Sequence, residues 1–193
     1  MLLRVFMAGA LALALQGCAG TPSALDAADH TALQSLALFD AHGGARFAIE
    51  LTCMGEETSC DTVEHAFSGW AGSRHIALHD RAPDAPAGGG RRLPSASDPS
   101  VPYRLAVTVA PVLVPSIDLT HVDQSGGLTG AGYTPPRVGY RATIRVIDAA
   151  SGARLREVSA AQQRTADYHA DANSYLRAEV NGLIANLDPA YRP

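Results

Sequence analysis

A short apolar run at the N-terminus decides which part of this chain can fold into a domain. Residues 5–15 are eleven uncharged, mostly apolar positions, and Arg4 stands directly before them. At 1.5 Å rise per residue, such a helix falls well short of the roughly 30 Å hydrocarbon core of a membrane. A run of this length behind a short positive segment is typical of a signal peptide. The sequence therefore predicts that residues 1–17 are removed, which leaves 176 of the 193 residues to fold.

The run closes in Leu15-Gln16-Gly17-Cys18, which resembles the lipobox of bacterial lipoproteins. The resemblance implies cleavage after Gly17, diacylglycerol on the Cys18 thiol and acylation of the new amino group, with palmitate as a typical chain. Two or more acyl chains, at about 0.8 kcal/mol per buried methylene, make release from a membrane negligible. Because Ala19 stands where inner-membrane retention would favour aspartate, the resemblance also implies an outer-membrane anchor. We expect the domain to face the periplasm.

Composition narrows the classes of function. The chain carries a formal net charge of −4, and loss of Arg4 with the signal peptide makes this −5. Nucleic-acid binding usually requires a basic surface, so we predict no nucleic-acid partner. All 15 basic side chains are arginine. The absence of lysine excludes a phosphate-loop lysine, a Schiff-base lysine and a Ser-Lys dyad, and no cofactor is predicted.

Two cysteines remain after lipidation, Cys53 and Cys60. In an exported protein, an even pair at short spacing indicates a structural disulfide, which would join the end of a strand to the start of a helix. A zinc half-site and a redox pair are the alternatives. Zinc would need further ligands, of which only His65 is near in sequence, and a redox pair normally has two intervening residues. No metal site is predicted.

Periodicity predicts an α+β fold with a mostly antiparallel sheet of about five strands and two or three helices packed on it. The expected strands are 47–51, 75–79, 105–110 with an extension to 114, 140–148 and 154–163. A helix is expected within 30–39. A second follows the capping box of Asp61 and Glu64 and ends at Gly72, and a third begins with Asn173 or Ser174 as its cap.

We expect three regions: a signal peptide at 1–17, a lipidated N-terminus and tether at 18–29, and a single periplasmic domain at 30–193. Two long loops are expected inside this domain, at 81–102 and 116–138, because both are rich in glycine and proline. The hairpin turn at 148–152 has the pattern Asp-Ala-x-Ser-Gly. In this it resembles small periplasmic lipoprotein domains, including the curli-secretion lipoprotein and the activators of penicillin-binding proteins. The turn mainly reports hairpin chemistry, so no functional residue is transferred from those families.

These features predict a non-catalytic envelope lipoprotein that binds a protein partner or helps to assemble an envelope structure. The 116–138 loop is the expected binding element, because long loops in compact domains tend to be functional or disordered. Leu128 and Tyr133 are its candidate partner-binding residues. The alternative is that these apolar residues fold back on the sheet.

A second class of function stays open, an envelope hydrolase or metal-dependent enzyme. It would use histidine, aspartate and serine residues of the same loop, namely Asp118, His121, Asp123 and Ser125. A second mixed group surrounds His169. His75 and His79 would share one face of a strand, but about 13 Å apart, too far to bind one metal ion. The sequence therefore assigns no catalytic residue.

Overall fold

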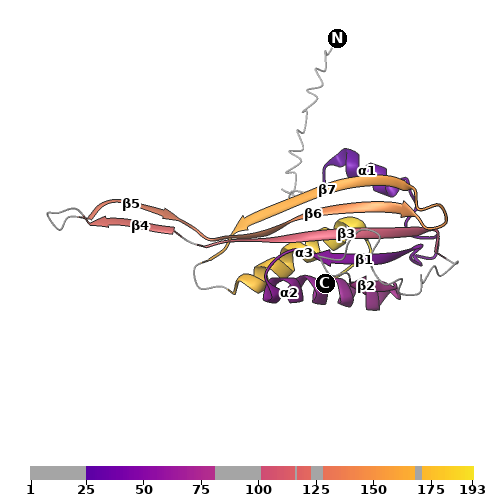
Figure 1. Ribbon diagram of the computed structural model, residues 1–193, viewed down its shortest axis with the longest axis horizontal. Coiled ribbons are helices and arrows are strands. Elements are labelled where there is room, and N and C mark those ends of the chain that lie inside the picture. Colours follow the sequence, from indigo (N-terminus) through magenta and orange to yellow (C-terminus); the bar gives the residue numbers. More distant parts are fainter. Residues whose placement is uncertain (1–24, 81–100, 116, 123–127, 168–170) are drawn as a thin grey trace, which may run out of the picture.

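The computed structural model describes residues 25–80, 101–115, 117–122, 128–167 and 171–193. Its elements in chain order are α1 (Ala27–Gln34), β1 (Phe47–Cys53), α2 (Glu57–Arg74), β2 (Leu78–Asp80), β3 (Tyr103–Val114), β4 (Ile117–Val122), β5 (Leu128–Thr134), β6 (Arg137–Asp148), β7 (Arg154–Thr165) and α3 (Ala172–Leu187). Within these ranges the fold is α+β, with a five-stranded sheet, three helices and a separate two-stranded sheet (Figure 1).

The main sheet is mixed, with strand order β2-β1-β3-β6-β7. β1 runs parallel to both β2 and β3, whereas β6 runs antiparallel to both β3 and β7. The expectation of a mostly antiparallel sheet is therefore wrong. Parallel neighbours need a long crossover connection, and α2 provides it between β1 and β2. The predicted helix between two predicted strands was the signal for this parallel unit.

The core lies between one face of the sheet and the helices. Period-two alternation places Leu105, Val107 and Val109 of β3 on this face, all at most 1% exposed. Trp70 of α2 is fully buried and packs against Phe67 and Phe47 at ring-centroid distances of 6.0 Å. α2 and α3 pack together beneath β1, β3 and β6. α2 thus buries the only tryptophan of the sequence.

Both ends of α2 differ from the helix ends that the sequence predicts. Its N-cap is Glu56, so Asp61 lies inside the helix and the predicted capping box is wrong. The helix also passes through Gly72 and ends at His75, which adopts the left-handed conformation with φ 55°. The Ile76 N–H then donates to the Ala71 carbonyl oxygen at 2.8 Å, which closes the helix end. The strand predicted from His75 therefore starts only at Leu78.

Cys53 and Cys60 form a disulfide with a Cα–Cα distance of 5.5 Å. Cys53 is the last residue of β1 and Cys60 lies in the first turn of α2, so the bond joins the end of a strand to the start of a helix, as the spacing predicts.

The other two helices also begin earlier than expected. Asp171 is the N-cap of α3, and its carboxylate accepts hydrogen bonds from the N–H groups of Asn173 and Ser174, the two predicted caps. α1 starts at Ala27, and Leu25 before it is 2% exposed. Within the described residues, packing against the core thus begins at Leu25.

Candidate functional site

The strands β4 and β5 form a two-stranded sheet of their own, here called the arm (Ile117–Val122 and Leu128–Thr134). Pairing of β3 with β6 runs to Val114 opposite Arg137, and the arm follows directly in both strands. Figure 1 shows the arm projecting beyond the end of the main sheet, away from the helices. The predicted 116–138 loop is therefore largely a β-ribbon, and the expectation of a structureless connection is wrong.

The sequence contained a signal for this ribbon. Gly126 and Gly127 separate two segments with β-branched and aromatic residues, which is the pattern of a hairpin. The many further glycines and the Pro135-Pro136 pair favoured a loop instead. The strands form in spite of Gly130 and Gly132 because they continue the long antiparallel ladder of β3 and β6.

Both candidate partner-binding residues lie on the arm. Leu128 is the first residue of β5 and pairs with Val122, whereas Tyr133 pairs with Asp118 nearer the main sheet. Neither residue belongs to the main sheet. Their predicted role in binding stays a prediction.

Only some of the residues that the enzyme alternative would use lie in the described part of the chain. Asp118 and His121 both lie in β4. Asp123, Ser125 and His169 lie outside the described residues. In the described part of the chain, no group of three or more His, Cys, Asp or Glu residues is placed to hold a metal ion.

Two carboxylates near His169 in sequence have structural partners. Asp171 caps α3, and its hydrogen bonds from Ser174 and Asn173 hold its pKa below the ordinary value. Asp167 accepts a hydrogen bond of 2.9 Å from the Tyr175 hydroxyl. Both carboxylates therefore have hydrogen-bond partners within the protein that account for their positions.

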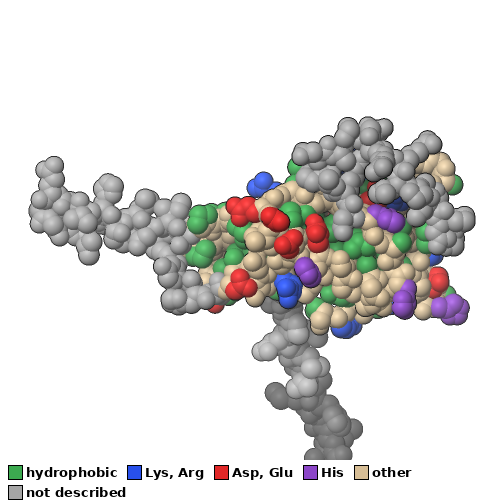
Figure 2. Space-filling model, turned by 60° about the horizontal axis from the view of Figure 1, so that its bottom comes forward, with side chains coloured by type: hydrophobic (Ala, Val, Ile, Leu, Met, Phe, Trp, Pro, Cys, Tyr) green, Lys and Arg blue, Asp and Glu red, His purple; other side chains and the backbone are tan. Residues whose placement is uncertain are grey.

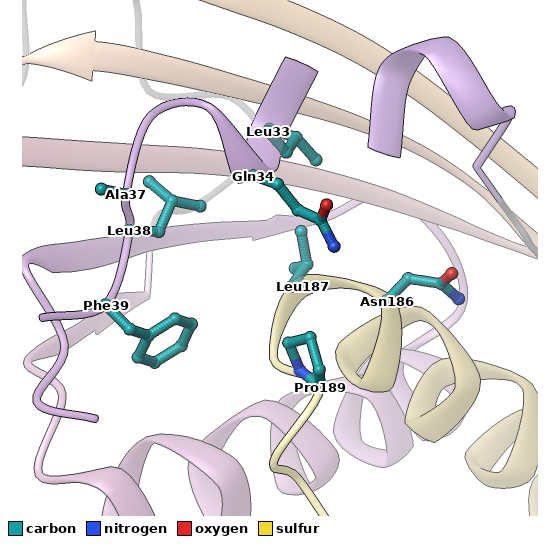
Figure 3. A pocket seen from close by; sticks show the side chains of 8 residues that line it. All are labelled: Leu33, Gln34, Ala37, Leu38, Phe39, Asn186, Leu187 and Pro189. Atoms are coloured by element: carbon teal, nitrogen blue, oxygen red, sulfur yellow. The ribbon is translucent and has the colours of Figure 1, made fainter. Parts of the chain in front are cut away.

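A cavity of about 190 Å³ lies between the residues that follow α1 and the end of α3. Figure 3 shows its lining, which consists of Leu33, Gln34, Ala37, Leu38, Phe39, Asn186, Leu187 and Pro189. None of these side chains is titratable, and the Asn186 amide already donates to the Gly182 carbonyl oxygen at 2.7 Å. The cavity therefore lacks the acid, base or nucleophile that catalysis would require.

The helix layer carries negative charge. Glu57, Asp61 and Glu64 follow one another along α2 at spacings of four and three residues, which places them on one side of the helix. Figure 2 shows acidic side chains gathered on one face of the molecule. This face offers little to a polyanionic ligand.

Two buried polar groups lie between β6 and α3. Glu179, with a side chain 7% exposed, forms an ion pair of 2.6 Å with Arg164. The fully buried Tyr140 hydroxyl has no hydrogen-bond partner within the described ranges. Burial raises the pKa of Tyr140, and the negative charge of Glu179 raises it further. A tyrosine held neutral in this way suits packing and not proton transfer near neutral pH.

No protein-family model and no curated protein matches this chain. Among solved structures, the PelC dodecamer from Paraburkholderia phytofirmans is similar with a TM-score of 0.40 and 18% identity, over 73% of this chain and 86% of that one. A putative neuraminyllactose-binding hemagglutinin homolog from Helicobacter pylori gives 0.42 and 7%, over 76% and 83%. Lipoprotein GNA1162 from Neisseria meningitidis gives 0.35 and 14%, over 72% and 99%. Because these TM-scores lie below 0.5, the similarities carry no argument about this chain.

Proposed function

We propose that this chain is a non-catalytic lipoprotein of the bacterial cell envelope, anchored through lipid on Cys18, which binds a protein partner in an accessory or assembly role. The anchor rests on the sequence of residues 1–18, which lie outside the described residues. The residue after the cysteine, Ala19, supports an outer-membrane location with the domain in the periplasm. No helix in the described ranges is long and apolar enough to span a membrane.

The arm is the observation that carries the binding role. A two-stranded ribbon is at best marginally stable by itself, because it has too little surface to bury. The arm nevertheless extends beyond the end of the main sheet as a separate two-stranded sheet (Figure 1). Such an element suits contact with another protein, and Leu128 and Tyr133 are placed at its two ends.

The anchor leads to a direct prediction. Wild-type protein produced in cells fed a labelled palmitate analogue should carry the label, and Cys18→Ser should carry none. Because two or more acyl chains hold a protein to a membrane almost irreversibly, the wild type should also partition into the detergent phase. The serine variant should remain in the aqueous phase. An unlabelled wild type would show that the proposed anchor is wrong.

The binding role predicts that Leu128→Ser combined with Tyr133→Ser abolishes recovery of the partner after crosslinking in intact envelopes. The melting temperature should change by less than about 2 °C, since both residues lie in the arm and outside the main sheet. Leu155→Ser is the matched control, because Leu155 is an apolar residue of β7 that is 44% exposed. It should leave recovery unchanged. Large destabilisation of the double variant with recovery intact would instead assign the two residues to the folded core.

A further inference from the structure

The strand edges of this fold differ in their protection against pairing with another chain. An unpaired edge presents free backbone N–H and C=O groups, and proteins protect such edges with charges, short length or bulges. Within the described residues, β2 and β7 are the edges of the main sheet, and each strand of the arm has one unpaired edge.

Both edges of the main sheet are protected. β2 has only three residues. β7 has twelve, but it is rich in arginine. Opposed residues of an antiparallel pair have their side chains on the same face of the sheet. When two identical strands pair, the two-fold axis between them must therefore pass at a residue and not midway between two residues. Two consecutive residues of β6 pair with Arg156 and Arg154, so Leu155 is an extra residue and β7 carries a bulge near its start. In self-pairing centred on Ser159, Arg154 would also lie opposite Arg164 of the second copy, and like charges directly opposite are destabilising.

The two edges of the arm are not equivalent. Leu119 pairs with Gly132 and His121 pairs with Thr129, so two residues of β5 lie opposite Thr120 alone. This is a β-bulge with the extra residue in β5. A bulge disrupts the ladder and bends its strand, which protects the β5 edge against a further strand. β4 has no extra residue.

The β4 edge has neither form of protection. In this six-residue strand only Asp118 is charged when histidine is neutral. An antiparallel pair of two β4 strands centred on Leu119 sets Asp118 opposite Thr120 and Ile117 opposite His121. Leu119 lies opposite itself, so no like charges are opposed. Charge therefore does not oppose pairing of this strand with its own copy.

We propose that β4 pairs antiparallel with β4 of a second copy of this chain, about a two-fold axis at Leu119. The arms of the two copies then form one four-stranded sheet, in the order β5-β4-β4-β5. Sheets of three or more strands are stable where a two-stranded ribbon is marginal, so the dimer gives the arm the strands that it lacks. Such an isologous contact uses the same surface on both copies and closes after two.

This inference rests on the proposed function because it also treats the arm as the binding element. It adds that a second copy of the chain is one partner. Binding of a different envelope protein and pairing of two copies have separate tests. Recovery of a different envelope protein depends on Leu128 and Tyr133 of β5, whereas dimerisation depends on the backbone edge of β4. The prediction of partner recovery can fail while that of dimerisation holds, and the reverse.

A cysteine at the axis tests the register. Opposed Cα atoms in antiparallel strands are about 4.5–5.5 Å apart, which lies within the range that a disulfide spans. Leu119→Cys, purified as the full mature protein in detergent and mildly oxidised, should run as a dimer that reductant converts to monomer. Wild type and Ser159→Cys, whose new thiol lies on an exposed position of β7, should remain monomeric on the same gel. A monomeric Leu119→Cys, or equal crosslinking of Ser159→Cys, overturns the proposal.

Charge at the axis provides an independent test. Leu119→Arg and Leu119→Glu each oppose like charges, so sedimentation equilibrium should show self-association of each weakened at least about tenfold relative to wild type. An equimolar mixture of the two variants should restore the dimer, because opposite charges then face each other. Damage to the fold of the arm would not be rescued by mixing. A wild type that stays monomeric at every concentration, or a mixture that fails to dimerise, overturns the proposal.

Discussion

Gly139→Ala should destabilise the protein more than any other single-methyl change at a described glycine. Gly139 is buried in β6 and pairs with Gln163 of β7. A Cβ atom there would overlap the Gln162 carbonyl oxygen and approach the Gln163 Cα to 2.7 Å. Both atoms belong to the backbone, so the neighbouring strand itself must move. Overpacking of this kind typically costs about 1–3 kcal/mol and occasionally more, and we expect the upper end.

Thermal unfolding measures this effect. For a domain of this size 1 kcal/mol shifts the melting temperature by about 2–4 °C, so Gly139→Ala should lower it by roughly 6–12 °C. Gly182→Ala is the control, because no atom lies within 4 Å of a Cβ at that position in α3. The control should stabilise by about 0.5–1 kcal/mol, since alanine favours a helix interior over glycine. Equal melting temperatures for the two variants would contradict the close approach of β6 and β7.

Asp188→Ala should cost about 3–5 kcal/mol, the usual effect of removing one partner from a buried ion pair. Asp188 follows α3 and is 1% exposed. Its carboxylate lies 2.8 Å from Arg74 Nε and accepts a hydrogen bond of 3.0 Å from Trp70 Nε1. It also accepts the N–H of Ala190 at 3.0 Å. Truncation leaves the buried indole N–H without its acceptor and the guanidinium without its counter-charge.

The tryptophan supplies the measurement. Trp70 is the sole tryptophan and contacts the altered group, so its fluorescence follows urea unfolding. Glu157→Ala is the control, because Glu157 also pairs with arginine, at 2.8 Å from both Arg145 and Arg154, but is 39% exposed. Exposed pairs contribute about 0–1 kcal/mol, so the control should change stability little. Similar losses in the two variants would mean that Asp188 does not join α3 to α2.

Sequence patterns predicted those elements that depend on local chemistry. The β6–β7 hairpin is confirmed, because apolar residues alternate along β6 up to a turn in which Ser151 hydrogen-bonds the Asp148 carboxylate. The Cys53–Cys60 spacing likewise predicted a bond that the structure contains. Each of these features is set by residues within a few positions of one another.

Features set by distant residues were not predicted. The parallel pairing of β1 with β3 depends on where the chain returns after α2, which no local pattern reports. Asp188 meets Trp70 and Arg74 across more than 110 residues of sequence, so neither side indicates the other. The arm was missed because glycine content favours loops, while its strands depend on extension of β3 and β6. The candidate residues Leu128 and Tyr133 lie on this segment, and its form as a β-ribbon was not foreseen.

The continuity of β3 and β6 also determines how the molecule would respond to a mechanical load. The two strands pair without a register shift from Tyr103 opposite Asp148 to Val114 opposite Arg137. The arm continues both strands from the same end of this ladder, so a pull on the arm along its length loads β3 and β6 together and does not slide one past the other. The load would then pass from β3 to β1 through their seven parallel residue pairs. Because backbone hydrogen bonds lie across the strands, it is this β1–β3 pairing that would resist the pull in shear.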